Sequence, residues 1–511
     1  MAAPRLYIVS PACRVLVPYE ADILREGGYG PAAYFANLAL PTLAACAPAH
    51  WEIALCDERV APVDLDFPAD FVFLTCNSRQ YPRMRELARE FRARGRVVVV
   101  GGPFPTLTPE AVRPFCDVLV KGELEEIAGT LFDDLRQGRA KPEYDGGWAD
   151  LERSPLPRWD LYPNDRTMVA AVQTSRGCPY DCSFCEVIQV YGRKPRLKTT
   201  AQVLREVDEV YARGYRSIFL TDDNLCAIPP RAKVLLAALA EWNARRGDDP
   251  AQFFTQMTMT ASKDPELLDL CARAGLVHVY IGIESPDADS LKEASKRPNL
   301  HLDITQALQA FYARGISVIG SMIVGFDADG PGVFDRFERF IGEVPLPIIQ
   351  IAPLVLTRGT PLHATMQAQG RLSGEDLLVD RTWVTNLIPL QMTRAELLEG
   401  LERLSSRLYA PDAFAARLRG FLRQASVAGA GRAVYPRSPD HVPGGRSVDR
   451  DAWRAVRAAL AGDPELKAVA AVVTAAERER AATAGWLFSQ VFEFLQMRRV
   501  FRPAPAAGAR A

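Results

Sequence analysis

Strand-like runs alternate with helix-like patterns along most of this chain, and they do so in two separate series. The first series occupies residues 1–140, and its helical patterns include residues 32–45. Such alternation favours βαβ units and a parallel sheet, and continuous apolar runs are typical of strands buried on both faces. We therefore predict a doubly wound, Rossmann-like α/β domain. Its strands are expected near residues 6–9, 51–56, 71–75, 97–100 and 118–120.

The second series begins after residues 141–165, which concentrate proline, glycine and aspartate and are predicted to form a linker. Residues 166–370 then repeat a strand-plus-helix pattern about every 35 residues, which predicts a partial (β/α)6 barrel, short of the eight units of a full barrel. Its strand candidates are residues 169–173, 217–221, 253–258, 278–283, 317–324 and 347–356.

The remainder of the chain turns helical. Residues 371–500 are predicted to form a helical C-terminal domain, with a long helical stretch at 465–499. Residues 426–449 are expected to be a long loop or lid. Residues 501–511 are expected to be a disordered tail.

Composition excludes several classes of protein. The 511 residues are 48% apolar and 24% charged, with a net charge of −1, so there is no basic surplus to neutralise nucleic-acid phosphates. The N-terminus lacks the layout of a signal peptide, and no apolar run approaches the roughly 18 residues of a membrane span. Of ten cysteines only three are clustered, which indicates a reducing compartment. We expect a cytoplasmic protein with no nucleic-acid partner.

The three clustered cysteines are Cys178, Cys182 and Cys185, spaced CxxxCxxC. Three thiolates at this spacing can bind three irons of a cubane iron–sulfur cluster, which leaves the fourth iron open for a small molecule. The alternative is a structural zinc site, but zinc needs a fourth cysteine or histidine and none lies nearby in sequence. The loop also follows the first strand of the barrel series, where barrels carry their chemistry.

The strand ends of the first series carry small and polar residues. Ligands of open parallel sheets bind at the carboxyl ends of the strands. The glycines there have a simple explanation as tight turns, and a functional one as points where backbone approaches a large flat ligand. A dinucleotide is disfavoured because no GxGxxG follows the first strand. The candidate ligand-binding residues are Ser10, Cys76, Asn77, Ser78, Gly101, Gly102, Gly122 and Glu123.

The cysteine loop resembles the signature of the radical S-adenosylmethionine (SAM) superfamily, whose CxxxCxxC follows the first strand of a six-unit partial barrel. The runs TDDN at 221–224, GIES at 282–285 and GSMIVGFD at 320–327 resemble its cobalamin-binding subclass. An α/β domain ahead of the barrel is that subclass's usual layout. The run TRGTPLH at 357–363 resembles a branch that includes hopanoid- and bacteriochlorophyll-modifying enzymes. The resemblance covers about residues 1–375.

The resemblance implies three cofactors. The three cysteines would ligate a [4Fe–4S] cluster, SAM would chelate its open iron, and the strand-end residues named above would bind cobalamin. The histidine motif with which many cobalamin proteins bind cobalt is absent, which implies binding without a histidine ligand. A pocket that no longer holds cobalamin is the alternative. The implied SAM-binding residues are Phe184, Asp222, Asp223, Asn224, Glu284, Ser285, Gly320 and Gly325.

The implied activity is methyl transfer to an unactivated carbon of a small molecule or lipid, through a 5′-deoxyadenosyl radical and methylcobalamin. It requires cobalt and cluster to face one cavity, so the two sheets should present their strand ends to each other. The alternatives are a radical SAM cyclase or rearranging enzyme without methyl transfer, and a non-catalytic cobalamin- or cluster-binding sensor.

Two further features have a simple and a functional explanation. His278 lies in an apolar strand and is predicted to be a core histidine with its hydrogen bonds satisfied. The basic run Arg193, Lys194, Arg196 and Lys198 is either a solvated face or a contact for an anionic group or for a flavodoxin- or ferredoxin-type electron donor.

Overall fold

The N-terminal part of the chain forms a six-stranded sheet whose paired strands all run parallel. The computed structural model describes residues 3–13, 33–247, 249–344, 346–374, 383–427, 448–479 and 484–501. The strand order reverses between β1 and β4, and such a switch point opens a crevice for ligands at the carboxyl ends of the strands. In spatial order the strands are β3 (Glu52–Asp57), β1 (Arg5–Ser10), β4 (Phe71–Thr75), β5 (Val97–Gly101), β6 (Val118–Lys121) and β7 (Glu143–Asp145).

Alternate residues of these strands belong to two different cores. Leu6 and Ile8 of β1 pack in the core that contains helices α2 (Ala39–Cys46) and α6 (Ala128–Arg136). Tyr7 and Val9 pack in the core that contains α3 (Tyr81–Ala93). Because side chains alternate across a strand, both faces of the sheet are covered. The predicted doubly wound domain is confirmed.

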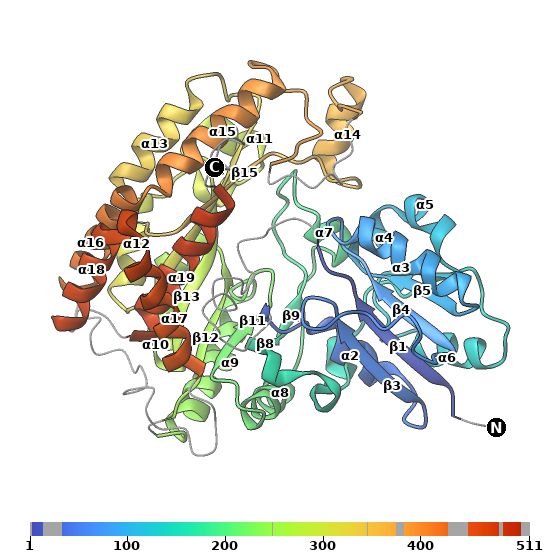
Figure 1. Cartoon of the computed structure of the whole chain (residues 1–511). Helices are drawn as coiled ribbons and strands as arrows, with labels where there is room; N and C mark the ends of the chain where they lie inside the picture. The colour runs from blue at the N-terminus through green and yellow to red at the C-terminus, as the bar shows by residue number, and fades with distance from the viewer. Residues whose placement is uncertain are drawn as a thin grey trace, which may run out of the picture.

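The middle of the chain forms the predicted partial barrel, shown in green and yellow in Figure 1. Its six strands lie side by side in chain order and pair in parallel. They are β8 (Thr167–Val172), β11 (Ser217–Leu220), β12 (Gln252–Met257), β13 (Leu276–Glu284), β14 (Ser317–Val324) and β15 (Ile349–Pro353). The helices between them are α8 (Thr200–Ala212), α9 (Pro229–Ala244), α10 (Pro265–Ala274), α11 (Ala288–Glu293), α12 (Ile304–Tyr312) and α13 (Val333–Glu343).

Strand β2 (Ala33–Phe35) corrects the prediction of one helix over residues 32–45. It leaves the N-terminal sheet and pairs in parallel with β8, so that the barrel sheet gains a seventh strand. Phe35 packs against the rings of Phe219 and Phe254, with centroids 5.5 and 6.0 Å apart. Aromatic packing and strand pairing from a distant part of the chain here outweigh the local helical pattern.

Strand β7 lies within the predicted linker, where it pairs with β6 and extends the N-terminal sheet.

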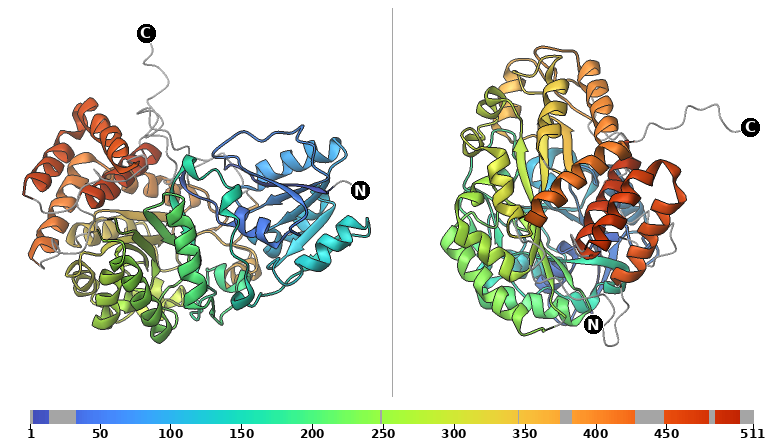
Figure 2. Two further views of the ribbon diagram at one scale, coloured as in Figure 1. Left: turned by 90° about the horizontal axis from the view of Figure 1, so that it is seen from below. Right: turned by 90° about the vertical axis from the view of Figure 1, so that its left-hand side faces the viewer.

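The C-terminal helices lie against the barrel, at the end of the molecule opposite the N-terminal sheet (Figures 1 and 2). The predicted stretch at 465–499 is two helices. The rings of Tyr34 and Phe492 stack with centroids 5.1 Å apart, which joins the last helix to strand β2. The helices are α15 (Arg394–Leu408), α16 (Pro411–Val427), α17 (Val448–Gly462), α18 (Lys467–Arg478) and α19 (Ala484–Phe501). Most of the predicted lid at 426–449 and of the predicted tail at 501–511 lies outside the described residues.

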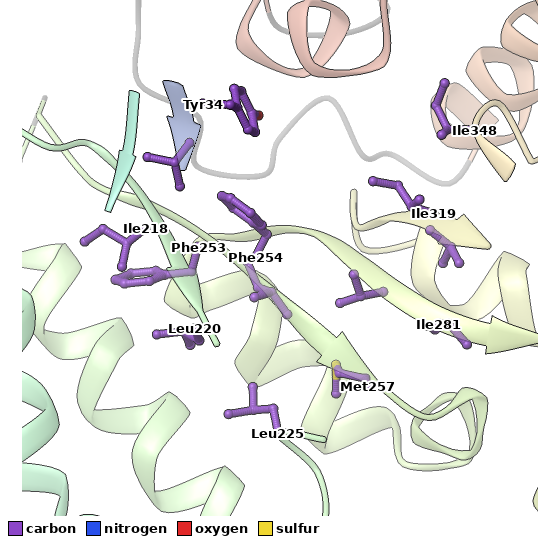
Figure 3. Close-up of a cluster of buried hydrophobic side chains, with 14 of the residues drawn as sticks. Tyr34, Ile218, Leu220, Leu225, Phe253, Phe254, Met257, Ile281, Ile319 and Ile348 are labelled. Carbon is purple, nitrogen blue, oxygen red and sulfur yellow. The ribbon is translucent and has the colours of Figure 1, made fainter. Parts of the chain in front are cut away.

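The barrel interior is largely apolar, and His278 is a buried polar residue within it. Figure 3 shows Tyr34 and Phe254 projecting from separate strands into the same cluster. His278 stacks on Phe254 with centroids 4.4 Å apart, but neither of its ring nitrogens has a hydrogen-bond partner. Burial lowers the pKa of His278 to about 3, so the ring is neutral. The predicted satisfied histidine is therefore wrong, although its place in the core is confirmed.

No helix in the described part of the chain combines the length and the apolar character that crossing a bilayer requires.

Candidate functional site

A cavity of about 650 Å³ lies between the two parallel sheets. Its walls come from the carboxyl ends of β4, β5 and β6 on one side and of β8 and β11 on the other. The barrel side contributes Gln173, Arg176, Thr221 and Asp223. The expectation that both sheets present their strand ends to one shared space is confirmed.

Most of the predicted cobalamin-binding residues line this cavity, namely Cys76, Asn77, Gly101, Gly102, Gly122 and Glu123. Ser10 and Ser78 are outside the cavity wall. Ser10 is buried, and its Oγ accepts hydrogen bonds from Asn37 Nδ2 at 2.8 Å and from Gln80 Nε2 at 3.0 Å. Ser78 is exposed. Ser10 therefore holds loops together beside the site.

Two glycines give this wall a bare backbone surface. Gly102 has φ +121°, and a Cβ at this position would lie 2.7 Å from the carbonyl oxygen of Cys76. Gly122 has φ +68°, and its Cβ would lie 2.6 Å from the carbonyl oxygen of Gly147. Only glycine fits such positions, because other residues meet both backbone strain and a clash. Because the clashing atoms belong to the protein backbone, the tight-turn explanation of both glycines holds, and their contact with a corrin ring stays a prediction.

The cysteine loop lies between β9 (Ser175–Arg176) and α7 (Val187–Val190) and is tied to three parts of the barrel. The amide of Cys178 donates to the carbonyl of Gly192 at 3.2 Å, and the amide of Ser183 donates to that of Ala294 at 3.1 Å. The amide of Leu362 donates to the carbonyl of Ser183 at 3.0 Å. Backbone hydrogen bonds to the rest of the chain therefore fix the conformation of the cysteine loop.

The three thiols suit a cluster better than a single ion. Among the residues that the structure describes, no three His, Cys, Asp or Glu side chains converge closely enough to hold one metal ion. A cubane does not require such convergence, because each thiolate binds a different iron. Burial raises the pKa of Cys185 to about 12 and raises those of Cys178 and Cys182, so binding of iron must displace their protons.

Lys296 is a site residue that sequence reasoning missed. Its side chain is 13% exposed, its Nζ lies 2.8 Å from Glu284 Oε1, and its charge acts on all three thiols of the cysteine loop. A buried cation at this place balances the negative charge of thiolates and of Glu284. Glu284 itself adopts φ +68°, in the left-handed region that non-glycine residues rarely occupy. Lys296 lies eleven residues beyond the GIES run and belongs to none of the motifs that the sequence displays.

Asp222 and Asp223 are adjacent but have different surroundings. Asp222 is fully buried and accepts hydrogen bonds from the amides of Thr174 and Ser175 at 2.7 Å and from the Thr174 hydroxyl. Asp223 lines the cavity and accepts from the amide of Gly177 at 3.1 Å. Burial raises the pKa of Asp223 to about 6. Of the two carboxylates, Asp223 is the one available to a ligand.

The other predicted SAM-binding residues lie away from the cavity wall. The amide of Gly325 donates to Asp329 at 2.8 Å, and the Ser285 hydroxyl accepts from the amide of Asp287 at 3.1 Å. Phe184 meets Phe326 edge-on at 6.3 Å. Gly320 lies within β14, and Asn224 Oδ1 lies 3.1 Å from the Cys226 thiol. Their contact with SAM stays a prediction.

A buried ion-pair network joins the two walls of the cavity. Glu123 pairs with Arg176 at 2.6 Å and with Arg196 at 2.5 Å, and Arg176 also pairs with Glu125 at 2.7 Å. Glu123 was predicted to contact cobalamin, but arginines already occupy both of its carboxylate oxygens. Sequence reasoning did not single out Arg176 or Glu125, because nothing local marks their contacts.

Comparison with known protein families fits both halves of this geometry. Residues 172–341 match the Radical SAM superfamily, and residues 33–132 match the B12 binding domain. Residues 360–459 match a domain of unknown function, DUF4070. The fold and site therefore define a cobalamin-binding radical SAM protein.

Several curated proteins resemble the chain over most of its length. The hopanoid C-2 methylase of Rhodopseudomonas palustris is 32% identical over 68% of this chain and 67% of its own length. An uncharacterized methyltransferase of Synechocystis is 33% identical over 69% of this chain and 67% of its own length. The bacteriochlorophyllide d C-12(1)-methyltransferase of Chlorobaculum tepidum is 25% identical over 75% of this chain and 84% of its own length.

Solved structures share the fold at low sequence identity. The cobalamin-dependent radical SAM enzyme OxsB has a TM-score of 0.62 at 15% identity, over 98% of this chain and 80% of that chain. The radical SAM methyltransferase TsrM from Kitasatospora setae has a TM-score of 0.56 at 17% identity, over 77% of this chain and 84% of that chain. The chain belongs to the family of cobalamin-dependent radical SAM methyltransferases, whose cofactors are a [4Fe–4S] cluster, SAM and cobalamin.

Proposed function

We propose that this enzyme methylates an unactivated carbon of a small molecule or lipid. The observation that carries the proposal is the single cavity whose opposite walls are the glycine-lined strand ends and the barrel strand ends beside the cysteine loop. When bound, the cofactors supply reductive cleavage of SAM to a 5′-deoxyadenosyl radical and carriage of a methyl group by cobalt. Both cofactors must reach one substrate carbon, and the cavity extends to Arg176, two residues before Cys178, at the start of the cysteine loop.

The residues of this chain bind and orient these groups. Cys178, Cys182 and Cys185 would hold three irons, and Lys296 would balance the charge of the thiolates. Asp223 lines the cavity and binds the amide of Gly177 at the start of the cysteine loop, so it would be available to the amine of SAM. Gly101 and Gly102, with the neighbouring strand ends, would form the floor that holds the corrin ring.

An apolar substrate suits the rest of the cavity. Apolar side chains, among them Phe35, Leu38, Phe73, Ala171 and Phe219, make up much of its lining. Relatives are described as acting on hopanoids and on bacteriochlorophyllide d, both of which carry large apolar skeletons. We propose a lipid or another largely apolar small molecule as the substrate class.

The test needs no knowledge of the substrate. The protein is purified anaerobically with cobalamin, its cluster is reconstituted, and it is incubated with SAM and a chemical reductant. We expect both S-adenosylhomocysteine and 5′-deoxyadenosine. Formation of 5′-deoxyadenosine alone contradicts methyl transfer, and absence of both products contradicts radical SAM activity. Cys178→Ala should abolish 5′-deoxyadenosine, whereas Cys116→Ala, a cysteine outside the loop, should not.

The electron that cleaves SAM must come from another protein, and we propose a flavodoxin- or ferredoxin-type donor. Arg193 and Lys194 are exposed, and the Gly192 carbonyl beside them binds the amide of Cys178 at 3.2 Å. Exposed cations this close to the cluster loop suit an acidic donor. Replacing both with glutamate should slow turnover with flavodoxin and leave turnover with a chemical reductant unchanged. Equal slowing with both reductants contradicts docking there.

We also infer that the enzyme works in the cytoplasm, because its cluster cysteines must stay reduced. Cell fractionation with an antibody against the chain tests this inference, and recovery in an oxidising compartment contradicts it.

A further inference from the structure

Glu123 receives two arginines from the other domain. It follows strand β6 of the N-terminal sheet, whereas Arg176 lies in β9 and Arg196 in β10 (Arg196–Leu197). The two arginines face each other as partners in the β9–β10 ladder, and Arg176 precedes Cys178 by two residues. The side chains of Glu123, Arg176 and Arg196 are 5%, 11% and 16% exposed. One buried carboxylate therefore connects the N-terminal sheet to the start of the cysteine loop.

The network has little freedom to move. The second oxygen of Glu123 also accepts from the amide of Ala149 at 3.1 Å, and Arg176 Nε donates to Gln173 at 2.7 Å. Gly146 packs so tightly on Glu123 that a Cβ there would lie 1.7 Å from the Glu123 carbonyl oxygen. A charge-assisted, bidentate arginine contact fixes geometry as well as contributing energy. The network behaves as a rigid strut between the two domains.

The strut lies in the wall of the cavity. Glu123, Glu125, Gln173 and Arg176 all line it. Two carboxylates and two guanidinium groups make the network electrically neutral. Every carboxylate oxygen of Glu123 already accepts from a donor, so Glu123 has no role as a proton acceptor to perform there. Because Glu123 lies between the two cofactor walls, the function left to it is to fix the distance between them.

We propose that Glu123, clamped by Arg176 and Arg196, is a positioning residue that sets the distance between the cobalamin floor and the cluster loop. The proposal rests on the function proposed above. Methyl transfer from SAM to cobalt depends on alignment across the cavity, and a misplacement of about 1 Å can cost about 100-fold in rate. Cleavage of SAM requires the cluster and SAM, both on the barrel side, and does not require cobalamin to be aligned across the cavity. Loosening the strut should therefore separate the two reactions.

The test compares Glu123→Gln with Glu143→Gln in the holoenzyme. Glu123→Gln keeps the shape of the side chain but removes its charge, while Arg176 keeps Glu125 and Arg196 keeps the Ala149 carbonyl. Glu143 is a matched control, because it also pairs with two cations, Lys121 and Arg113, but lies at the solvent-facing edge of the same sheet. We expect the ratio of S-adenosylhomocysteine to 5′-deoxyadenosine to fall about tenfold or more in Glu123→Gln. The control should keep the wild-type ratio.

A second measurement does not depend on activity. Pulsed electron paramagnetic resonance gives the distance between the reduced cluster and cob(II)alamin. We expect a shifted or broadened distance distribution in Glu123→Gln and the wild-type distribution in Glu143→Gln. A wild-type ratio together with a wild-type distance overturns the proposal. Loss of either cofactor from Glu123→Gln also overturns it, because Glu123 would then hold a cofactor instead of spacing the two.

A third variant and the wild type complete the design. Glu123→Asp keeps the charge but shortens the side chain by one methylene, so the proposal expects both cofactors bound and a ratio between those of wild type and Glu123→Gln. A wild-type ratio in this variant counts against the proposal. If wild-type enzyme itself forms no S-adenosylhomocysteine, the proposed function fails, but the distance measurement still decides whether Glu123 spaces the domains.

Discussion

Replacing Glu493 with glutamine should stabilise the last helix, and should do so more strongly as pH rises. Glu493 lies in α19, is 3% exposed, and accepts a hydrogen bond from the Tyr280 hydroxyl at 3.3 Å. Burial raises its pKa from 4.5 to about 8, with the tyrosine bond acting in the opposite direction. At neutral pH the carboxyl is therefore protonated in the folded state and ionised when the helix detaches.

The size of the effect follows from the difference between the two pKa values. An acid whose folded pKa is raised stabilises the folded state less and less as pH climbs from 4.5 to about 8, and the loss levels off above that. Each unit of pH within this window is worth about 1.4 kcal/mol. Glutamine has no proton to lose and can still accept from Tyr280. The variant should thus gain less than about 1 kcal/mol at pH 5 and about 3 kcal/mol at pH 7.

Hydrogen exchange measures this gain locally, which suits a chain of several domains better than a global unfolding curve. Protection of the α19 amides, corrected for intrinsic exchange, is compared between variant and wild type from pH 5 to pH 8. We expect the protection ratio to grow by roughly tenfold per pH unit. Glu402→Gln, an exposed change in α15, should leave α19 unaffected. A constant ratio, or one that shrinks with pH, refutes a neutral buried Glu493.

Three further substitutions probe the site and the core. Lys296→Met leaves Glu284 buried without its cation and should destabilise the holoenzyme by about 3–5 kcal/mol, measured by thermal unfolding; an unchanged Tm counts against the pair. Gly102→Ala should sharply reduce bound cobalamin, because its Cβ meets a carbonyl oxygen at 2.7 Å, whereas Gly138→Ala, with φ +66° but open space around it, should not. His278→Phe removes two unpaired buried nitrogens and should raise stability by about 1 kcal/mol; a lower Tm would show that the ring has an unseen partner.

The parts of the fold that could be predicted are those with a local signature. The buried strands are visible as apolar runs. Cys178, Cys182 and Cys185 are recognised by their CxxxCxxC spacing, which lies within one short loop. The position of a strand end is known once the strand is predicted. Gly101 and Gly102 could therefore be placed at the end of the strand at 97–100 without knowledge of their neighbours in space. Each of these features is decided within about ten residues of sequence, where period and turn chemistry are informative.

The parts that could not be predicted depend on contacts between distant segments. Strand β2 pairs with β8 across more than a hundred residues of chain, and nothing in residues 33–35 announces that pairing. Lys296 pairs with Glu284, whose backbone is left-handed, and the sequence marks neither the pair nor the conformation. His278 was predicted to find a hydrogen-bond partner, but its surroundings are aromatic. Such contacts are set by tertiary packing, which one sequence does not display.

The cysteine loop is held from three directions, and this explains why its neighbours carry so many buried charges. Asp222 and Asp223 bind the amides of residues 174, 175 and 177 and so tie the start of the loop to β11. Ser183 ties its middle to the segment after α11. Glu123, through Arg176, ties it to the other domain. A loop that must hold a cluster at a set distance from a second cofactor needs contacts with both domains. Because these charged contacts are buried, little water competes for them, and each holds its partner in one orientation.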